Sequence, residues 1–257
     1  MGQESSKLLR TSIYVINLER SIERRTMFEA HAAASQTSLS WVYHRAHTEL
    51  SDDLHYDPRD ALIAKGRELY PAELGVYSSH HSVWKRFLAE GADQALILED
   101  DVVLDWDFVI ELTRIDLGQM GLRYLKLFNK NITPYRLVSE HFCRRTLIDC
   151  RGFAHGMQAY MVTRSGVAHF AEFCRQVRRP IDDELDRTWA HGIPNIAVFP
   201  FPAFERHGPT TIGTVRYEPH SLPRKLNLPR FTMRLAEKLR RGRQRVAGYG
   251  FQPPLTN

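Results

Sequence analysis

The chain has 257 residues, of which 43% are hydrophobic and 25% are charged, and its formal net charge is +5. This balance is ordinary for a globular protein with a sizeable core, so no disulfide staples are needed. No apolar run reaches transmembrane length and the N-terminus lacks the apolar region of a secretion signal, so a cytoplasmic protein is expected. The three cysteines include no C-x-x-C pair, which favours reduced thiols over a metal site.

Strand and helix patterns alternate along most of the chain. Strand patterns occur at residues 12–18, 41–46, 95–98, 124–128, 147–150, 156–163 and 195–199. Helix patterns, the clearest with apolar residues at three- and four-residue steps, occur at residues 21–34, 71–88, 107–113, 165–176 and 182–190. Residues 51–59 are polar and predict a loop. The alternation predicts an α/β fold with a mostly parallel sheet and flanking helices.

The composition changes near residue 219. We expect one domain over residues 1–219 and a basic extension over residues 220–257. Residues 230–246 contain seven Lys or Arg and one Glu, which leaves the rest of the chain near neutral. Such runs are usually solvated, but interspersed Phe and Leu residues also fit an amphipathic helix on an anionic membrane surface. Nucleic acid is not expected as a partner, because no aromatic-basic recognition module is visible.

Three consecutive acids, Glu99, Asp100 and Asp101, directly follow the strand pattern at 95–98. Acids in a row are usually a solvated turn, but α/β folds bind ligands at the carboxyl ends of strands. Carboxylates clustered there repel one another unless a cation or several donors neutralise them. The triplet therefore predicts a site for a divalent cation, Mn²⁺ or Mg²⁺, that holds a phosphorylated ligand.

The end of the first strand pattern has two interpretations. Asn17, Leu18 and Arg20, with Arg24 in the next helix, form either a charged helix start or a nucleotide-binding loop. In the second interpretation, Asn and backbone amides contact a base or ribose, and Arg side chains balance a diphosphate. The chain has no Walker A loop and no G-x-G-x-x-G motif, so a kinase, an ATPase or a dinucleotide enzyme is not supported.

Two further motifs place polar side chains on predicted helices. On the helical period His81 shares the apolar face with Trp84, so His80 points elsewhere. A lone helical histidine is more often structural than catalytic. Asp182 and Asp183 begin another helix pattern. They either favour the helix dipole or supply a general base for an acceptor hydroxyl.

Five motifs occur in a fixed order along the chain: VINLERSIERR, ELGVYSSHHSVWKRFLAEG, ALILEDDVVL, GMQAYMVTRSG and PIDDEL. Together they resemble glycosyltransferase family 25, which includes lipopolysaccharide and lipooligosaccharide biosynthesis enzymes and collagen galactosyltransferases. The resemblance runs from about Ile13 to about Gly213. It implies a Rossmann-like GT-A fold, a divalent cation, a UDP-sugar donor (UDP-galactose or UDP-glucose) and inversion at the anomeric carbon.

The resemblance also implies roles for single residues. The metal ligands would be Asp101 and Glu99. Residues 205–212 depart from the family pattern, and His207 in this segment is a further candidate ligand that the resemblance does not supply. The donor-binding residues would be Asn17, Leu18, Arg20, Arg24, His80, Glu99 and Asp100. The acceptor-side base would be Asp182 or Asp183.

We therefore expect an inverting glycosyltransferase that moves galactose or glucose from a UDP-sugar to a glycan, glycolipid or lipooligosaccharide acceptor. It would act in the cytoplasm or on the inner face of the membrane. One rival is a metal-dependent nucleotidyltransferase, which would release pyrophosphate from a nucleoside triphosphate. The other is a non-catalytic protein that keeps the fold and binds a nucleotide-sugar, and the altered segment 205–212 keeps it open.

Overall fold

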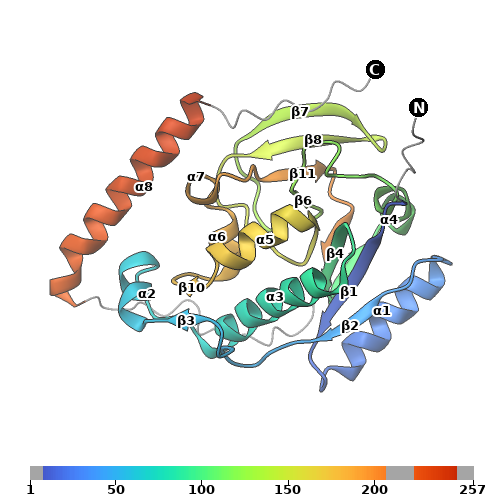
Figure 1. Ribbon diagram of the computed structural model, residues 1–257, viewed down its shortest axis with the longest axis horizontal. Helices are drawn as coiled ribbons and strands as arrows, with labels where there is room; N and C mark the ends of the chain where they lie inside the picture. Colours follow the sequence, from blue (N-terminus) through green and yellow to red (C-terminus); the bar gives the residue numbers. More distant parts are fainter. Residues whose placement is uncertain (1–7, 207–222, 248–257) are drawn as a thin grey trace, which may run out of the picture.

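The computed structural model describes residues 8–206 and 223–247, and its centre is one eight-stranded sheet (Figure 1). The sheet has the strand order β2–β1–β4–β9–β6–β11–β8–β7. Its strands are β1 (Thr11–Asn17), β2 (Val42–Arg45), β4 (Gln94–Glu99), β6 (Tyr124–Lys126), β7 (Tyr135–Phe142), β8 (Arg145–Cys150), β9 (Ala159–Thr163) and β11 (Ile196–Phe199). Two short pairs lie outside it: β3 (His55–Tyr56) with β10 (Gln176–Val177), and β5 (Val102–Leu104) with β12 (Ala203–Glu205).

Helices cover both faces of the sheet. The helices are α1 (Ile22–Ala34), α2 (Pro58–Ala64), α3 (Pro71–Glu90), α4 (Trp106–Thr113), α5 (Arg164–Phe173), α6 (Ile181–Leu185), α7 (Thr188–His191) and α8 (Asn227–Ala247), with a 3₁₀ turn at Arg224–Leu226. Successive side chains of β1 point to opposite faces, as a strand requires. Tyr14 and Ile16 join the core under α3 and α5, whereas Ile13 and Val15 join the core under α1 and α4. Both faces are therefore buried, which explains the almost continuous apolar runs of the central strands.

The prediction of a mostly parallel sheet was wrong, because the sheet is mixed. β1 pairs parallel with β2 and β4, and β6 pairs parallel with β11. β9 runs antiparallel to both β4 and β6, and β8 runs antiparallel to β11 and β7. The parallel trio β2–β1–β4 still brings three carboxyl ends to one edge, with Asn17 opposite Arg45 and Glu99 opposite Ile16.

Most predicted elements are present, with several local differences. The loop expected at residues 51–59 contains β3 and the start of α2, and the helix expected at 182–190 is divided into α6 and α7. β7 was not predicted. It forms a hairpin with β8 through Cys143 and Arg144, which both have a positive φ, 48° and 60°.

The basic segment forms the long helix α8, which contacts α2 and α7 (Figure 1). The boundary expected at residue 219 falls within residues 207–222, which lie outside the described part of the chain. Among the residues that the structure describes, no helix is both long and apolar enough to cross a membrane.

Candidate functional site

Acidic side chains gather where β4 ends. Glu99 is the last residue of β4, and Asp100 and Asp101 form the turn into β5. β12 pairs antiparallel with β5 and places Glu205 opposite Val102. We call Glu99, Asp100, Asp101 and Glu205 the acid cluster. The prediction that the triplet stands at the end of a buried strand is confirmed, and the fourth acid comes from a distant part of the chain.

Arg24 neutralises part of the acid cluster, and Asn17 donates a hydrogen bond to it. The Arg24 guanidinium pairs with Asp100 Oδ1 at 3.0 Å and also with the Asp101 carboxylate. Asn17 Nδ2 donates to Asp100 Oδ2 at 2.6 Å, and Asp100 is only 5% exposed. Asp100 is therefore held inside the protein, and Asn17 and Arg24 contact the acids directly.

Asp101 is the member of the acid cluster whose negative charge is not fully stabilised by its neighbours. Burial, followed by the negative charge of Glu99, raises the pKa of Asp101 to about 7 even though Arg24 lies against it. Its Oδ1 is buried and accepts no hydrogen bond. A buried carboxylate oxygen without a partner, among further acids, is a donor set that suits a divalent cation. The residues present thus fit the predicted cation site.

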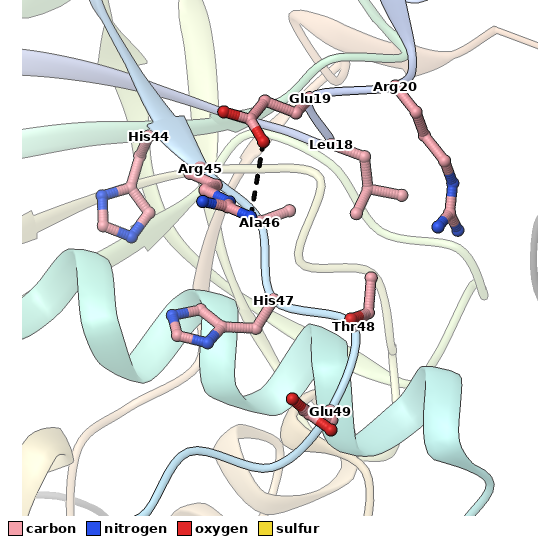
Figure 2. A pocket seen from close by; sticks show the side chains of 9 residues that line it. All are labelled: Leu18, Glu19, Arg20, His44, Arg45, Ala46, His47, Thr48 and Glu49. Carbon is pink, nitrogen blue, oxygen red and sulfur yellow. Dashed lines mark ion pairs between the residues drawn. The ribbon is translucent and has the colours of Figure 1, made fainter.

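A pocket of about 640 Å³ opens at the carboxyl ends of β1 and β2 (Figure 2). Its lining consists of Leu18, Glu19, Arg20, His44, Arg45, Ala46, His47, Thr48 and Glu49. The volume is typical of small-molecule sites. Leu18 and Arg20, both predicted to border a nucleotide, line this pocket, while the adjoining Asn17 contacts the acid cluster. Pocket and acid cluster are therefore joined through one short stretch of β1 and its following turn.

His80 is buried beneath Glu99 in a hydrogen-bonded row of side chains. Trp84 Nε1 donates to the Tyr160 hydroxyl at 2.8 Å, and that hydroxyl lies 3.0 Å from His80 Nδ1. An indole nitrogen only donates, so the tyrosine proton is left to bond His80 Nδ1. His80 Nε2 faces Glu99 Oε1 at 3.6 Å. His80 is 1% exposed, so it lies behind Glu99 rather than at the surface of the acid cluster.

Tyr160→Phe should lower the free energy of unfolding by about 1–3 kcal/mol, because Trp84 Nε1 and His80 Nδ1 both lose their buried partner. Urea unfolding measures the change. Tyr124→Phe is the matched control, since Tyr124 is also buried and, among the described residues, its hydroxyl bonds to Met157 Sδ at 3.6 Å. Equal losses for the two variants would contradict the row as described.

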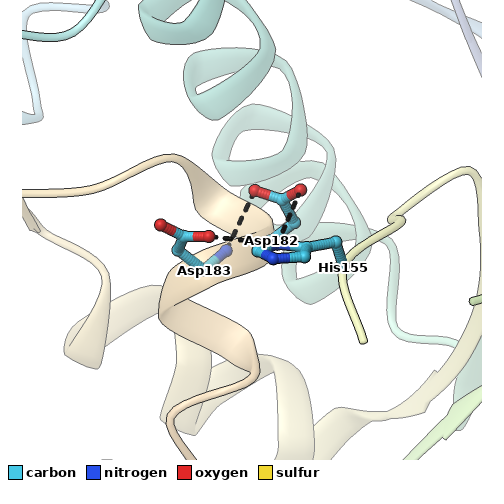
Figure 3. Close-up of side chains that lie close together, drawn as sticks. All are labelled: His155, Asp182 and Asp183. Carbon is cyan, nitrogen blue, oxygen red and sulfur yellow. Dashed lines mark hydrogen bonds and ion pairs between the residues drawn. The ribbon is translucent and has the colours of Figure 1, made fainter. Parts of the chain in front are cut away.

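A second charged group surrounds the start of α6 (Figure 3). His155 Nδ1 lies 3.0 Å from Asp183 Oδ1 and 3.5 Å from Asp182 Oδ2. Hydrogen bonds to Asp182 and Asp183 raise the pKa of His155 to about 9, so the imidazole is protonated at neutral pH. Lys65 forms an ion pair with Asp183. Ligand atoms of His155, Asp182 and Asp183 lie within 4.8 Å of one another. This trio is a further candidate for a divalent cation, whose binding would require His155 to release its proton.

The two aspartates of α6 differ in exposure. The side chain of Asp183 is 6% exposed and held by Lys65 and His155, whereas that of Asp182 is 26% exposed. A general base must contact a substrate hydroxyl. Of the two carboxylates, Asp182 is therefore the one that a substrate hydroxyl could reach, and Asp183 belongs to the ion-pair network with Lys65 and His155.

One short segment connects the two charged groups. His155 lies three residues before Gln158, whose backbone oxygen accepts from Glu99 N at 2.8 Å. The structure thus joins the β1 turn, the acid cluster, His80 and the α6 aspartates into one region of the fold. His207, the remaining predicted ligand, lies outside the described residues.

Comparison with known proteins decides the family. The family model "Glycosyltransferase family 25 (LPS biosynthesis protein)" matches residues 10–185, more than half of the chain. The chain belongs to glycosyltransferase family 25. The matched residues include the β1 turn, His80, the acid triplet and both α6 aspartates, whereas Glu205 and α8 lie beyond them.

Two curated proteins are similar to this family 25 chain. A "Glycosyltransferase 25 family member" of Anopheles gambiae is 32% identical over 102 residues, which are 37% of this chain and 17% of that protein. "Inactive glycosyltransferase 25 family member 3" of Homo sapiens is 23% identical over 198 residues, 72% of this chain and 32% of that protein. The chain thus spans a third or less of these relatives.

A solved structure of A197 from STIV aligns with a TM-score of 0.41 and 14% identity, covering 78% of this chain and 87% of that one. That likeness is too low to carry an argument. The family model shows the family, and the structure shows the mixed α/β fold and the two charged groups.

Sequence reasoning missed three residues of the two charged groups. Glu205 joins the acid cluster through the β5–β12 pair, Lys65 reaches Asp183 from the end of α2, and His155 reaches it from the segment before β9. Each contact joins residues far apart in the chain. His155 had no local signal, because it precedes a strand pattern and α/β folds carry site residues at the carboxyl ends of strands. The antiparallel pairing of β9 with β4 is what brings the start of β9 to the end of β4.

Proposed function

We propose that this protein is an inverting, divalent-cation-dependent glycosyltransferase of GT-A type that acts in the cytoplasm. It transfers galactose or glucose from a UDP-sugar to a glycan, glycolipid or lipooligosaccharide acceptor. The observation that carries the proposal is the buried, partnerless Oδ1 of Asp101 in an acid cluster next to a nucleotide-sized pocket. Family membership supports a transferase, and the geometry supports a donor held at the ends of β1, β2 and β4.

The donor would lie with its nucleoside in the pocket and its diphosphate toward the acid cluster. Leu18 and Ala46 offer apolar surface for a base, and Arg20 and Arg45 offer positive charge for phosphate oxygens. Asn17 and Arg24 fix the position of Asp100. Asp101 and Glu99 would hold the divalent cation, which when bound offsets the charge that develops on the diphosphate leaving group.

The acceptor would be activated at α6. Asp182 is the exposed carboxylate there and would accept the proton of the attacking hydroxyl. Protonated His155 and Lys65 keep positive charge beside Asp183, which fixes the start of α6. Attack from the side opposite the leaving diphosphate would invert the anomeric carbon.

The test is a screen of UDP-sugars for manganese-dependent release of UDP by the purified chain, with and without glycan acceptors. We expect UDP release from UDP-galactose or UDP-glucose that is lost when the cation is chelated. Pyrophosphate release from a nucleoside triphosphate would instead establish a nucleotidyltransferase.

A non-catalytic nucleotide-sugar-binding protein is the second candidate, and the name of the human relative, an inactive member, favours it. In that case UDP with manganese would raise the melting temperature while no UDP-sugar is hydrolysed or transferred. This outcome would overturn the catalytic proposal and keep the donor site.

A further inference from the structure

The only acidic residue of helix α8, Glu237, forms ion pairs with the body of the protein. Glu237 Oε1 lies 3.0 Å from Arg179 and 2.6 Å from Arg187, and Arg179 is itself buried. Arg230 donates to the backbone oxygens of Leu62 at 3.1 Å and Lys65 at 3.4 Å, at the carboxyl end of α2. A cation at a helix C-terminus satisfies carbonyls that lack helical partners. The basic segment is therefore a docked helix with a defined inner face.

The outer face of α8 is an apolar stripe. Leu228, Phe231, Leu235 and Leu239 follow one another at three- and four-residue steps and are between 45% and 71% exposed. We call these four residues the α8 stripe. On the helical period the stripe lies opposite Glu237, so the side of α8 that points away from the protein is apolar.

Basic side chains border the α8 stripe. Arg234 and Lys238 are exposed along one edge, and Arg243 is exposed along the other. The single acid of the helix is used by Arg179 and Arg187, so no negative charge of α8 opposes them. An apolar stripe between rows of cations is the pattern of a helix that lies in the interface of an anionic bilayer.

We propose that α8 docks this protein on an anionic lipid bilayer. The α8 stripe would lie among the acyl chains, and the Lys and Arg residues that border the stripe would lie at the headgroups. A second copy of the chain fits this face less well, since pairing two stripes would bring rows of like charge together. Nucleic acid would leave the central stripe without an apolar partner.

The docking would also orient the candidate acceptor site. Arg179 and Arg187, the two partners of Glu237, stand on either side of α6, which carries Asp182. A bilayer-bound α8 therefore holds α6 at a fixed place relative to the lipid surface. This part of the inference rests on the proposed function and indicates an acceptor carried by lipid; the docking itself stands without it.

The test is sedimentation of the full chain with vesicles of phosphatidylcholine, with and without phosphatidylglycerol. We expect binding only to the anionic vesicles, weakening as salt rises. Phe231→Asp together with Leu235→Asp should weaken binding about 100-fold, since two apolar side chains leave the bilayer. Arg234→Gln together with Lys238→Gln should weaken it about 20-fold.

Ile22→Asp is the matched control, because Ile22 is 70% exposed on α1, on the other side of the molecule from α8 (Figure 1). It should bind vesicles as the unchanged chain does, and circular dichroism should show all variants folded. Equal vesicle binding by the stripe variant and the control would overturn the proposal. The proposal would also be overturned if the unchanged chain sedimented as a dimer, the stripe substitutions dissociated that dimer, and neither protein bound vesicles. Absence of transfer activity with intact vesicle binding would overturn only the proposed function.

Discussion

Asp101→Asn should reduce transfer from the UDP-sugar by about a thousandfold, the effect of removing a ligand that holds the charge-stabilising cation. The amide keeps the shape of the side chain but loses the negative charge at the partnerless Oδ1. Manganese-dependent UDP release measures the loss, and Asp107→Asn, an exposed acid on α4, is the control that should stay active. Full activity of Asp101→Asn would show that Asp101 is not a metal ligand.

The same substitution should make the cation-free protein more stable at neutral and higher pH. The folded pKa of Asp101, about 7, lies above its ordinary value of 3.8. A group with a raised pKa contributes its full stability below the unfolded value and loses it as pH rises through the folded value. The unchanged chain should therefore lose stability between about pH 4 and pH 7 from this group, and the Asn variant should not. Melting temperatures across this range, without divalent cations, test the difference.

Asp182→Asn should lower kcat by about 100- to 10,000-fold while leaving the KM for the UDP-sugar nearly unchanged, as expected for a general base that contacts only the acceptor. Asp183→Asn should act mainly on stability, because Lys65 and protonated His155 would lose a buried partner. Steady-state kinetics and urea unfolding of both variants separate the two roles. The reverse pattern, with kcat lost in Asp183→Asn and kept in Asp182→Asn, would exchange the assignments.

Local patterns predicted the acid triplet because both of its signals are adjacent in sequence: a buried apolar strand and the acids that end it. They also predicted the β1 turn, since Leu18 and Arg20 follow their strand directly. Strand direction could not be predicted, because an apolar run such as β9 has the same sequence pattern in a parallel and in an antiparallel pair. Only its pairing with β4 and β6 shows that it is antiparallel.

Two other features could not be predicted from the local sequence. The residues of β7 alternate little between polar and apolar. The turn after β7 has Cys143 and Arg144 at positive φ, whereas an Asn-Gly pair would have predicted a hairpin. Glu205 enters the acid cluster through a strand pair that joins residues about a hundred positions apart, Glu205 and Val102. Contacts of this kind follow from tertiary packing, which one sequence does not display.

The segment from His155 to Gln158 limits how far apart the two charged groups can lie. Three peptide steps separate these residues, so their Cα atoms are at most about 11 Å apart. One end touches the α6 aspartates and the other is bonded to Glu99. If the donor and the acceptor bind as proposed, this short segment would keep the acceptor hydroxyl at α6 close to the diphosphate at the acid cluster.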